Sequence, residues 1–319
     1  MFRDLIIGHG TYGTVFFGID IKNANPIAIK VSNNEKRNKS FSSEIEIMNN
    51  LSEYKIFNQV YDEFFLKNQY YLVETLQGPD LSKIRKFYGK RFSIITLYKI
   101  MIEIINCLKL IHKAGYLYID LKSNNIAVLC EKIKYRKNIS NLILIDYGFC
   151  EKISNDKNKA PKEYGKKSYS SINALKGNPI SRKDDIIVLC YFILDLFSGS
   201  LPWDNIPSDK NRKEEIIKLK EKFSFKKFCG KDIKEVAFIF ESANGLKFNE
   251  IPDYDNYINL LQNYIKIKTG KEDTEILFDW EDKIIENIKY FGGIEAYLKM
   301  IKKYQFYSKV IQNFLLKIF

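Results

Sequence analysis

The chain has 319 residues, of which 45% are apolar and 14% aromatic, and this composition excludes an intrinsically disordered protein. The length is sufficient for one large domain or for two lobes with separate cores. The net charge of +12 fits either a solvated Lys-rich surface or a basic face for acidic or phosphate-bearing ligands. Nucleic acid is not an expected partner, because no compact block of Lys and Arg with interleaved aromatic residues occurs.

The five cysteines indicate the compartment in which the protein works. Their number is odd and no C-x-x-C pair occurs, which favours reduced thiols and argues against a zinc site or a disulfide framework. We therefore expect an intracellular protein, cytoplasmic or nuclear and not secreted, and we expect it to be a monomer. The longest apolar run, residues 186–197, contains Asp195 and is too short to span a bilayer of about 30 Å, so no membrane span is expected.

Short strands are predicted over most of the first 75 residues, where β-branched and aromatic side chains alternate with turn residues. These strands cover residues 4–10, 14–20, 26–32 and 69–75. One helix is predicted between them at residues 39–54, because apolar side chains recur there at about helical spacing. This part of the chain is therefore expected to form a small β-rich unit.

From about residue 79 the pattern is mainly helical. Residues 93–116 predict an amphipathic helix of more than four turns, and Gly115 is a plausible stop signal. Its apolar face is formed by Leu97, Met101, Ile104, Ile105, Leu108 and Ile111. Two short strands enclose the mainly polar residues 120–125, a further apolar strand ends near residue 149, and helices follow the polar stretch 151–170.

Together these patterns predict an α+β fold with a small β-rich lobe at residues 1–77 and a larger, mainly helical lobe at residues 78–283. The joint between them is placed at the turn residues that surround Gly78. The last segment, residues 284–319, has apolar residues at helical spacing on both sides of a Gly-Gly pair. We expect this segment to dock as helices on the larger lobe.

Residues 8–15, GHGTYGTV, contain the pattern G-x-G-x-x-G-x-V. The dinucleotide-binding fingerprint uses the same glycines but leads into a helix, whereas here a β-prone segment follows. The glycines are therefore expected at a hairpin turn. That turn is either an ordinary one or a loop whose exposed amides fold over phosphates.

A possible ion pair follows the glycine motif. Lys30 lies in the predicted strand 26–32, and Glu44 lies on the predicted helix. A lone lysine on a strand is usually exposed, but a glutamate on a packing helix can hold its ammonium against phosphates. Glu46 is the rival partner, and it points to a different face of the helix from Glu44.

Asp120, Lys122 and Asn125 form the motif D-x-K-x-x-N, and Asp146 follows at the end of an apolar strand. An Asp can orient and deprotonate an attacking hydroxyl, and a Lys can neutralise a transferring phosphoryl group. Amide and carboxylate oxygens can ligate Mg²⁺. A surface turn would explain each polar residue alone. It does not explain their order and spacing together with the glycine motif and Lys30.

With these motifs in order, the chain resembles a eukaryotic protein kinase. Residues 165–186, GKKSYSSINALKGNPISRKDDI, are similar without a gap to the casein kinase I pattern G-T-A-R-Y-A-S-I-N-x-H-x-G-x-x-x-S-R-R-D-D-L. The segments GSLPW at 199–203, PDYDNY at 252–257 and FDW at 278–280 follow in that family's order. The resemblance covers about residues 5–283, and the Tyr of Asp-Tyr-Gly also resembles the sister group of vaccinia-related kinases.

The resemblance implies the two-lobed protein kinase fold, with ATP and Mg²⁺ as cofactors. It implies transfer of the ATP γ-phosphoryl group to Ser and Thr hydroxyls of protein substrates, which are expected to be acidic or pre-phosphorylated. The implied catalytic residues are Asp120 as base, Lys122, Lys30 and Glu44, and the implied metal ligands are Asn125 and Asp146. The residues implied in ATP binding are Ile7, Gly8, Gly10, Gly13, Val15, Ala28, Lys30, Thr75, Gln77, Asn125 and Asp146. Asp185 is implied to brace the catalytic loop.

Four positions depart from the family pattern. Tyr118 and Ile119 replace the usual His-Arg before the catalytic Asp, and the missing Arg normally binds a phosphate on the activation loop. Its loss predicts activity without such phosphorylation. Ser168 stands where the family has an Arg that helps to bind a phosphate already on the substrate. Glu74 is an acid at the gatekeeper position, where the family usually has an apolar residue or Thr. We interpret it as a residue that makes a hydrogen bond at the back of the nucleotide pocket.

Lys122 and the match over residues 165–173 favour a serine/threonine protein kinase. One alternative is a pseudokinase that binds a protein partner as a scaffold, but the retained Lys30, Asp120, Asn125 and Asp146 argue against it. Another is a nucleic-acid-associated protein that uses its net positive charge. A salt titration of binding would identify that activity, because phosphate contacts give a steep salt dependence.

Overall fold

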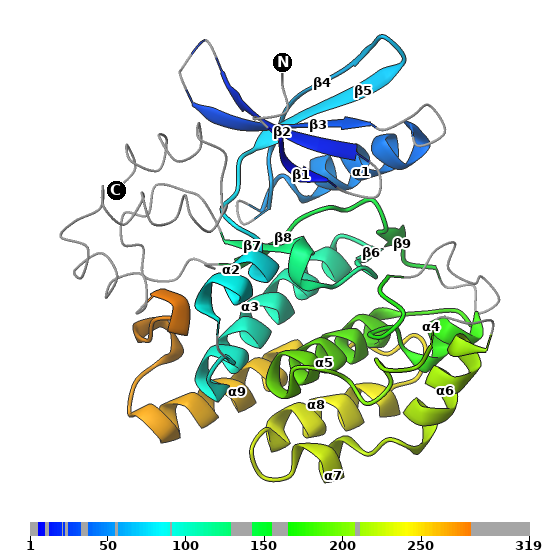
Figure 1. Cartoon of the computed structure of the whole chain (residues 1–319), viewed down its shortest axis with the longest axis vertical. Coiled ribbons are helices and arrows are strands. Elements are labelled where there is room, and N and C mark those ends of the chain that lie inside the picture. Colours follow the sequence, from blue (N-terminus) through cyan, green and yellow to red (C-terminus); the bar gives the residue numbers. More distant parts are fainter. Residues whose placement is uncertain are drawn as a thin grey trace. The chain divides into compact units, whose positions relative to one another are not determined.

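The fold is taken from a computed structural model of the chain, shown in Figure 1. It describes residues 6–9, 13–20, 22, 25–32, 38–54, 57–89, 91–128, 142–154, 165–207 and 211–281. The described residues fall into two compact units. The first is drawn from Met1–Gly89, Ile126–Gly148 and Leu277–Phe319, and the second from Lys90–Asn125 and Phe149–Ile276.

The first unit contains a five-stranded antiparallel sheet with the strand order β1-β2-β3-β5-β4. The strands are β1 (Ile6–His9), β2 (Gly13–Ile19), β3 (Pro26–Ser32), β4 (Val60–Leu66) and β5 (Gln69–Thr75). Lys30 on β3 lies opposite Val15 on β2 and Leu72 on β5, so it occupies the centre of the sheet. Four strands were predicted, and β4 was not, because all of its residues after Val60 are exposed and show no alternation.

Helix α1 (Asn38–Leu51) packs against β4 and β5 of this sheet. Phe41, Ile45, Met48 and Leu51 recur at helical spacing and are all buried. Burial of this apolar stripe attaches the helix to the sheet and turns one helical face toward β3. Glu44 lies on that buried face, whereas Glu46 is exposed.

Three smaller elements complete the first unit: α2 (Leu81–Tyr88), β7 (Ile126–Val128) and β8 (Leu142–Leu144). Asp80 caps α2 by accepting a hydrogen bond from the Lys83 amide, and Gly89 ends the helix with φ of 70°. Strands β7 and β8 pair antiparallel, and β8 leads directly to Asp146. The mainly polar residues 120–125 are therefore not the turn of a hairpin, because β7 pairs with β8 rather than with the strand that precedes them.

The second unit is mainly helical. Its core contacts join α3 to α5 and α9, and α5 to α8. Its elements are α3 (Ile94–Lys113), β6 (Tyr116–Leu117), η3 (Ser123–Asn125), β9 (Glu151–Lys152), α4 (Ile172–Lys176), α5 (Arg182–Ser198), α6 (Arg212–Lys222), α7 (Phe225–Cys229), α8 (Lys234–Gly245), α9 (Tyr254–Thr269) and η4 (Asp273–Glu275). Every residue from Asp184 to Leu196 is buried, so the long apolar run is a core helix as predicted. Gly115, with φ of 89°, follows the end of α3 where a stop was predicted.

The predicted α+β class is confirmed by the antiparallel sheet of the first unit and the helices of the second. The division of the chain at residues 77 and 78 stays a prediction, because both units are built from non-contiguous segments. The predicted helices of residues 284–319 lie outside the described residues, as does Gly10. None of the helices in the described ranges is long and apolar enough to cross a membrane.

Candidate active site

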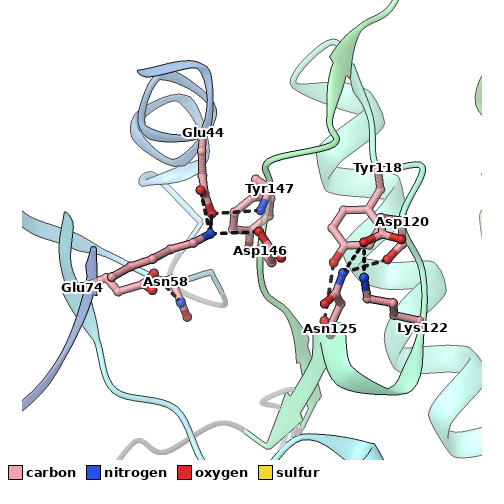
Figure 2. Close-up of polar contacts among 10 residues, drawn as sticks. Glu44, Asn58, Glu74, Tyr118, Asp120, Lys122, Asn125, Asp146 and Tyr147 are labelled. Carbon is pink, nitrogen blue, oxygen red and sulfur yellow. Dashed lines mark hydrogen bonds and ion pairs between the residues drawn. The ribbon is translucent and has the colours of Figure 1, made fainter. Parts of the chain in front are cut away.

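The first unit contains a buried cluster of one ammonium and two carboxylates, which Figure 2 shows beside Tyr147. The Nζ atom of Lys30 lies 2.7 Å from Oε1 and 2.7 Å from Oε2 of Glu44. It also donates a hydrogen bond of 2.9 Å to Oδ1 of Asp146. The backbone amide of Tyr147 donates to Glu44 at 3.2 Å. The predicted Lys30–Glu44 ion pair is therefore present, and Asp146 joins it.

Local structure explains why these three side chains converge. Lys30 is buried on β3, and Glu44 is on the buried face of α1 that packs on the sheet. Asp146 follows β8 and adopts φ of 64°, a left-handed conformation that is uncommon outside glycine. The rival carboxylate Glu46 is exposed, as expected from its place on another face of the helix.

Burial and charge set the protonation of this cluster. Burial alone would lower the pKa of Lys30, but the neighbouring carboxylates of Asp146 and Glu44 outweigh that effect and raise it. Burial raises the pKa of Glu44, against the opposing effect of the Lys30 ammonium. The lysine therefore stays a cation, and it is positioned to attract further negative charge.

Glu74, which the sequence predicts at the gatekeeper position, lies on β5 opposite Ala28 of β3. Its Oε2 atom accepts a hydrogen bond of 2.8 Å from the side-chain amide of Asn58. Burial raises the pKa of Glu74 to about 7, and the nearby Lys30 ammonium opposes this rise. Asn58 was not predicted as a site residue. Asn58 is a buried polar residue just before an edge strand. Nothing in the sequence at this position indicates which residue it bonds to.

The second unit contains the cluster formed by Asp120, Lys122 and Asn125, also drawn in Figure 2. The Nζ atom of Lys122 lies 2.5 Å from Oδ2 of Asp120. The side-chain amide of Asn125 donates to the same Oδ2 at 3.0 Å and to the backbone oxygen of Asp120 at 2.9 Å. The single turn η3 brings Asn125 back to Asp120. The three residues of the predicted motif are thus joined in one hydrogen-bonded group.

The backbone before Asp120 is held by Asp185 of α5. Oδ2 of Asp185 accepts from the Tyr118 amide and Oδ1 from the Ile119 amide, each at 2.8 Å. His112 lies 2.8 Å from the same carboxylate. Ile119 has φ of 71°, which is unfavourable for a β-branched residue and needs this support. Asp185 therefore braces the loop from α5.

Gly165 lies against the backbone of Ile119 and Asp120, and no role was predicted for it from the sequence. A Cβ atom at Gly165 would lie 2.7 Å from the backbone oxygen of Ile119 and 3.0 Å from Cα of Asp120. Only a glycine allows this close approach without a shift of backbone. The signal was available in the quoted family pattern, where a Gly opens the matched segment.

The other residues implied in ATP binding lie in the first unit. Ile7 and Gly8 are on β1, Gly13 and Val15 on β2, and Ala28 on β3. Thr75 ends β5, and its amide donates to the backbone oxygen of Gln59 at 3.1 Å. Gln77 follows two residues later. Their roles in nucleotide binding stay predictions.

The donor atoms present suit the cofactors that the resemblance implies. Mg²⁺ prefers oxygen ligands, and Asp146 offers a carboxylate with 18% of its side chain exposed. The Asn125 amide nitrogen is turned to Asp120, which leaves its amide oxygen as the possible ligand atom. The Lys30 ammonium supplies the positive charge that a phosphate group needs. Chemically, the two clusters can bind phosphate and metal and can accept a hydroxyl proton.

Comparison with known proteins agrees with this chemistry. The profile of the protein kinase domain matches residues 3–267. Casein kinase I homologs 2 and 3 of Schizosaccharomyces pombe are 25% and 26% identical over 292 residues, which are 86% of this chain and 64% and 63% of theirs. Casein kinase I homolog 1 of Saccharomyces cerevisiae is 26% identical over 289 residues, 86% of this chain and 52% of its own length. The chain thus spans between about half and two thirds of these relatives, and their names support the predicted casein kinase I resemblance.

Proposed function

The chain belongs to the protein kinase family, and from this membership we propose that it is an ATP-dependent protein serine/threonine kinase of the casein kinase I type. It would transfer the γ-phosphoryl group of ATP to Ser and Thr hydroxyls of protein substrates. The observation that carries the proposal is the Lys30 ammonium held by Glu44 and Asp146, since a pseudokinase scaffold has no need for this buried charge arrangement.

Each residue has a chemical task in this proposal. Lys30 attracts the ATP phosphates, and Glu44 keeps its ammonium in place. Asp146 and Asn125 are the proposed ligands of Mg²⁺, which when bound neutralises charge on the phosphates. Asp120 accepts the proton of the attacking hydroxyl, while Lys122, 2.5 Å from Asp120, neutralises charge on the transferring group.

Substrate class and regulation are inferred from the sequence positions. Lys122 two residues after Asp120 follows the serine/threonine pattern, and residues 165–173 match a peptide-binding segment. The basic residues near that segment favour acidic or pre-phosphorylated substrates. Ile119 in place of the usual Arg favours activity without phosphorylation of the activation segment.

The test is transfer of labelled phosphate from ATP and Mg²⁺ to dephosphorylated casein, with phosphoamino-acid analysis of the product. The wild-type chain should label Ser and Thr, and Asp146→Asn should reduce the rate to background while remaining folded. If the wild-type chain labels casein no faster than Asp146→Asn does, the chain is not an active kinase, and the scaffold alternative takes its place.

A further inference from the structure

Lys220 on α6 is a buried lysine that none of the proposed catalytic steps uses. Only 4% of Lys220 is exposed. Lysines are almost never buried without a partner, so its contacts need an explanation. Its Nζ atom lies 3.9 Å from the ring centre of Tyr191 and 4.7 Å from that of Trp203. Two aromatic faces thus surround the charged end of this side chain.

Lys220 makes a hydrogen bond to residues 165–173, the segment that resembles a peptide-binding segment. Its Nζ atom donates a hydrogen bond of 2.6 Å to the backbone oxygen of Ser170. Two residues earlier, the indole nitrogen of Trp203 donates a hydrogen bond of 2.7 Å to the backbone oxygen of Ser168. Lys220 and Trp203 also contact each other, because the Lys220 Nζ atom lies over the Trp203 ring. The two side chains therefore form one group that holds residues 168–170.

The next residue of the segment is anchored as well. The Ser171 hydroxyl donates to Oδ1 of Asp184 on α5 at 2.6 Å. Anchors from α5, from α6 and from Trp203 therefore fix Ser168, Ser170 and Ser171. Beside them lies a cavity of about 290 Å³ whose lining includes Tyr191, Lys220 and Phe240. Because the cavity leaves this side of the segment without close packing, hydrogen bonds rather than van der Waals contacts hold the segment there.

Stability alone does not account for a lysine at this position. Taking an ammonium out of water costs several kcal/mol, and one carbonyl bond with two ring contacts recovers only part of that cost. Burial correspondingly lowers the pKa of Lys220 well below its usual value, and Asp204 opposes this only in part. An apolar side chain would fill the same space between the rings at a smaller cost.

We propose that Lys220 is a positioning residue for substrate peptides. By donating to the Ser170 backbone oxygen, it holds residues 168–171 in the conformation that receives the peptide. This inference rests on the proposed function, because the peptide-receiving role of the segment comes from that proposal.

The experiment compares Lys220→Met with Lys218→Met, an exposed lysine on the same helix. Lys220→Met keeps the side-chain volume but removes the donor. Amide hydrogen exchange of residues 165–173 should be at least tenfold faster in this variant. Fluorescence-polarisation binding of a peptide with Asp three residues before a Ser should weaken about tenfold, as expected for the loss of one charge-assisted contact. The ATP KM should change less than twofold and the Tm by less than about 3 °C. Lys220→Arg, which keeps donors and stacks on the rings, should recover most of the peptide affinity.

Unchanged exchange and unchanged peptide binding in Lys220→Met would overturn the inference. So would a loss of Tm above about 10 °C, because Lys220 would then be a structural residue. The proposed function is judged separately, by phosphate transfer from the wild-type chain. A wild-type chain that binds the peptide but transfers no phosphate contradicts the proposed function, while the Lys220 comparison still decides the inference. A wild-type chain that does neither contradicts both.

Discussion

Asn58 donates a hydrogen bond of 2.8 Å to the carboxylate of Glu74, while its own amide oxygen is buried with no hydrogen-bond partner in the described ranges. The pair joins the segment just before β4 to β5, close to the charges of Lys30, Glu44 and Asp146. With Glu74, three acids lie near the single ammonium of Lys30, so this group has more carboxylates than cations. Burial first, and then the neighbouring carboxylates of Glu44 and Asp146, raise the pKa of Glu74 to about 7 against the opposing effect of the Lys30 ammonium.

The raised pKa of Glu74 predicts a stability that falls as pH rises. Between the ordinary pKa of 4.5 and about 7, the folded state keeps a proton that the unfolded state has lost. The free energy of unfolding therefore decreases as pH rises through this range. From pH 5.5 to 8, wild-type protein should lose about 2 kcal/mol more than Glu74→Gln in urea unfolding.

Glu63→Gln is the matched control for that measurement, because Glu63 is an exposed acid on the neighbouring strand β4. It should follow the wild-type pH dependence. Parallel wild-type and Glu74→Gln curves would show that the Glu74 carboxyl has no raised pKa in the folded protein.

The Lys30 cluster predicts different stabilities for two inactive variants. Lys30→Met leaves the buried carboxylate of Glu44 and the partly exposed carboxylate of Asp146 without their cation, which should cost about 3–5 kcal/mol. Asp146→Asn leaves the Lys30–Glu44 pair intact and should unfold within a few degrees of wild type. Both should lose phosphate transfer, and thermal unfolding without nucleotide should separate them.

A second substitution tests the cause of that difference. Glu44→Gln added to Lys30→Met removes one unpaired carboxylate and should recover at least half of the lost stability. A Lys30→Met variant as stable as wild type would contradict the predicted cost of leaving these carboxylates without their cation.

Gly165 predicts an activity effect at a position with no side chain. In Gly165→Ala, the new Cβ would lie 2.7 Å from the Ile119 oxygen and 3.0 Å from Oδ1 of Asp120, so the carboxylate must move. A displacement of the proposed base should reduce kcat at least tenfold. Gly245→Ala is the control, because a Cβ there has no atom within 4 Å and should leave kcat unchanged. Equal kcat values for the two variants would disprove the close approach.

Hydrophobic spacing and motif order were sufficient to predict the fold class and the convergence of Lys30 with Glu44. The apolar stripe of α1 leaves one face for contact with the sheet, so Glu44 could be chosen over Glu46 before the structure was known. Asp146 could be placed at the end of an apolar strand for the same reason. These inferences depend on local periodicity, which the sequence carries directly.

Contacts across distant segments could not be predicted in this way. The partner of Glu74 is Asn58, and nothing in the spacing of the two residues indicates a bond. Strand β4 was missed because an edge strand exposes both faces and so loses its alternation. Lys220 follows the buried Ile216 by one helical turn, which would have indicated its inward position, but a lysine there is normally read as solvated.

Ile119 predicts that the dephosphorylated protein is fully active. Its side chain is 7% exposed and carries no charge, so it cannot bind a phosphate on the activation segment as the usual Arg does. Phosphatase treatment of the purified protein should change its rate of casein phosphorylation by less than twofold. Removal of phosphate from residues 149–170, verified by mass spectrometry, must accompany the measurement. A treated enzyme that loses its activity would contradict this prediction.

The last prediction concerns the choice of substrate. Ser168 is buried, and its backbone oxygen is bonded to Trp203, so the position offers no guanidinium for a substrate phosphate. The Lys183 ammonium is committed to the backbone oxygen of Leu246 at 2.6 Å. Lys166, by contrast, is exposed, and its ammonium is held by the Tyr169 hydroxyl at 2.9 Å. A single ammonium attracts carboxylates nearly as well as phosphates, whereas a guanidinium clamps a phosphate through two bonds.

We therefore expect a preference for acidic peptides with only a modest advantage for primed ones, smaller than in the family by about 1–3 kcal/mol. Turnover of three peptides tests this, with Ala, Asp or phosphoserine placed three residues before the target Ser. Asp should raise kcat/KM several-fold over Ala, and phosphoserine should add little more. Lys166→Ala should reduce the preference for Asp, because Lys166 is exposed to a bound peptide. Lys183→Ala should leave the preference unchanged, because Lys183 is only partly exposed and its ammonium bonds to the backbone oxygen of Leu246. A phosphoserine preference of about a hundredfold would contradict recognition of the substrate by lysines alone. Equal turnover of all three peptides would contradict it as well.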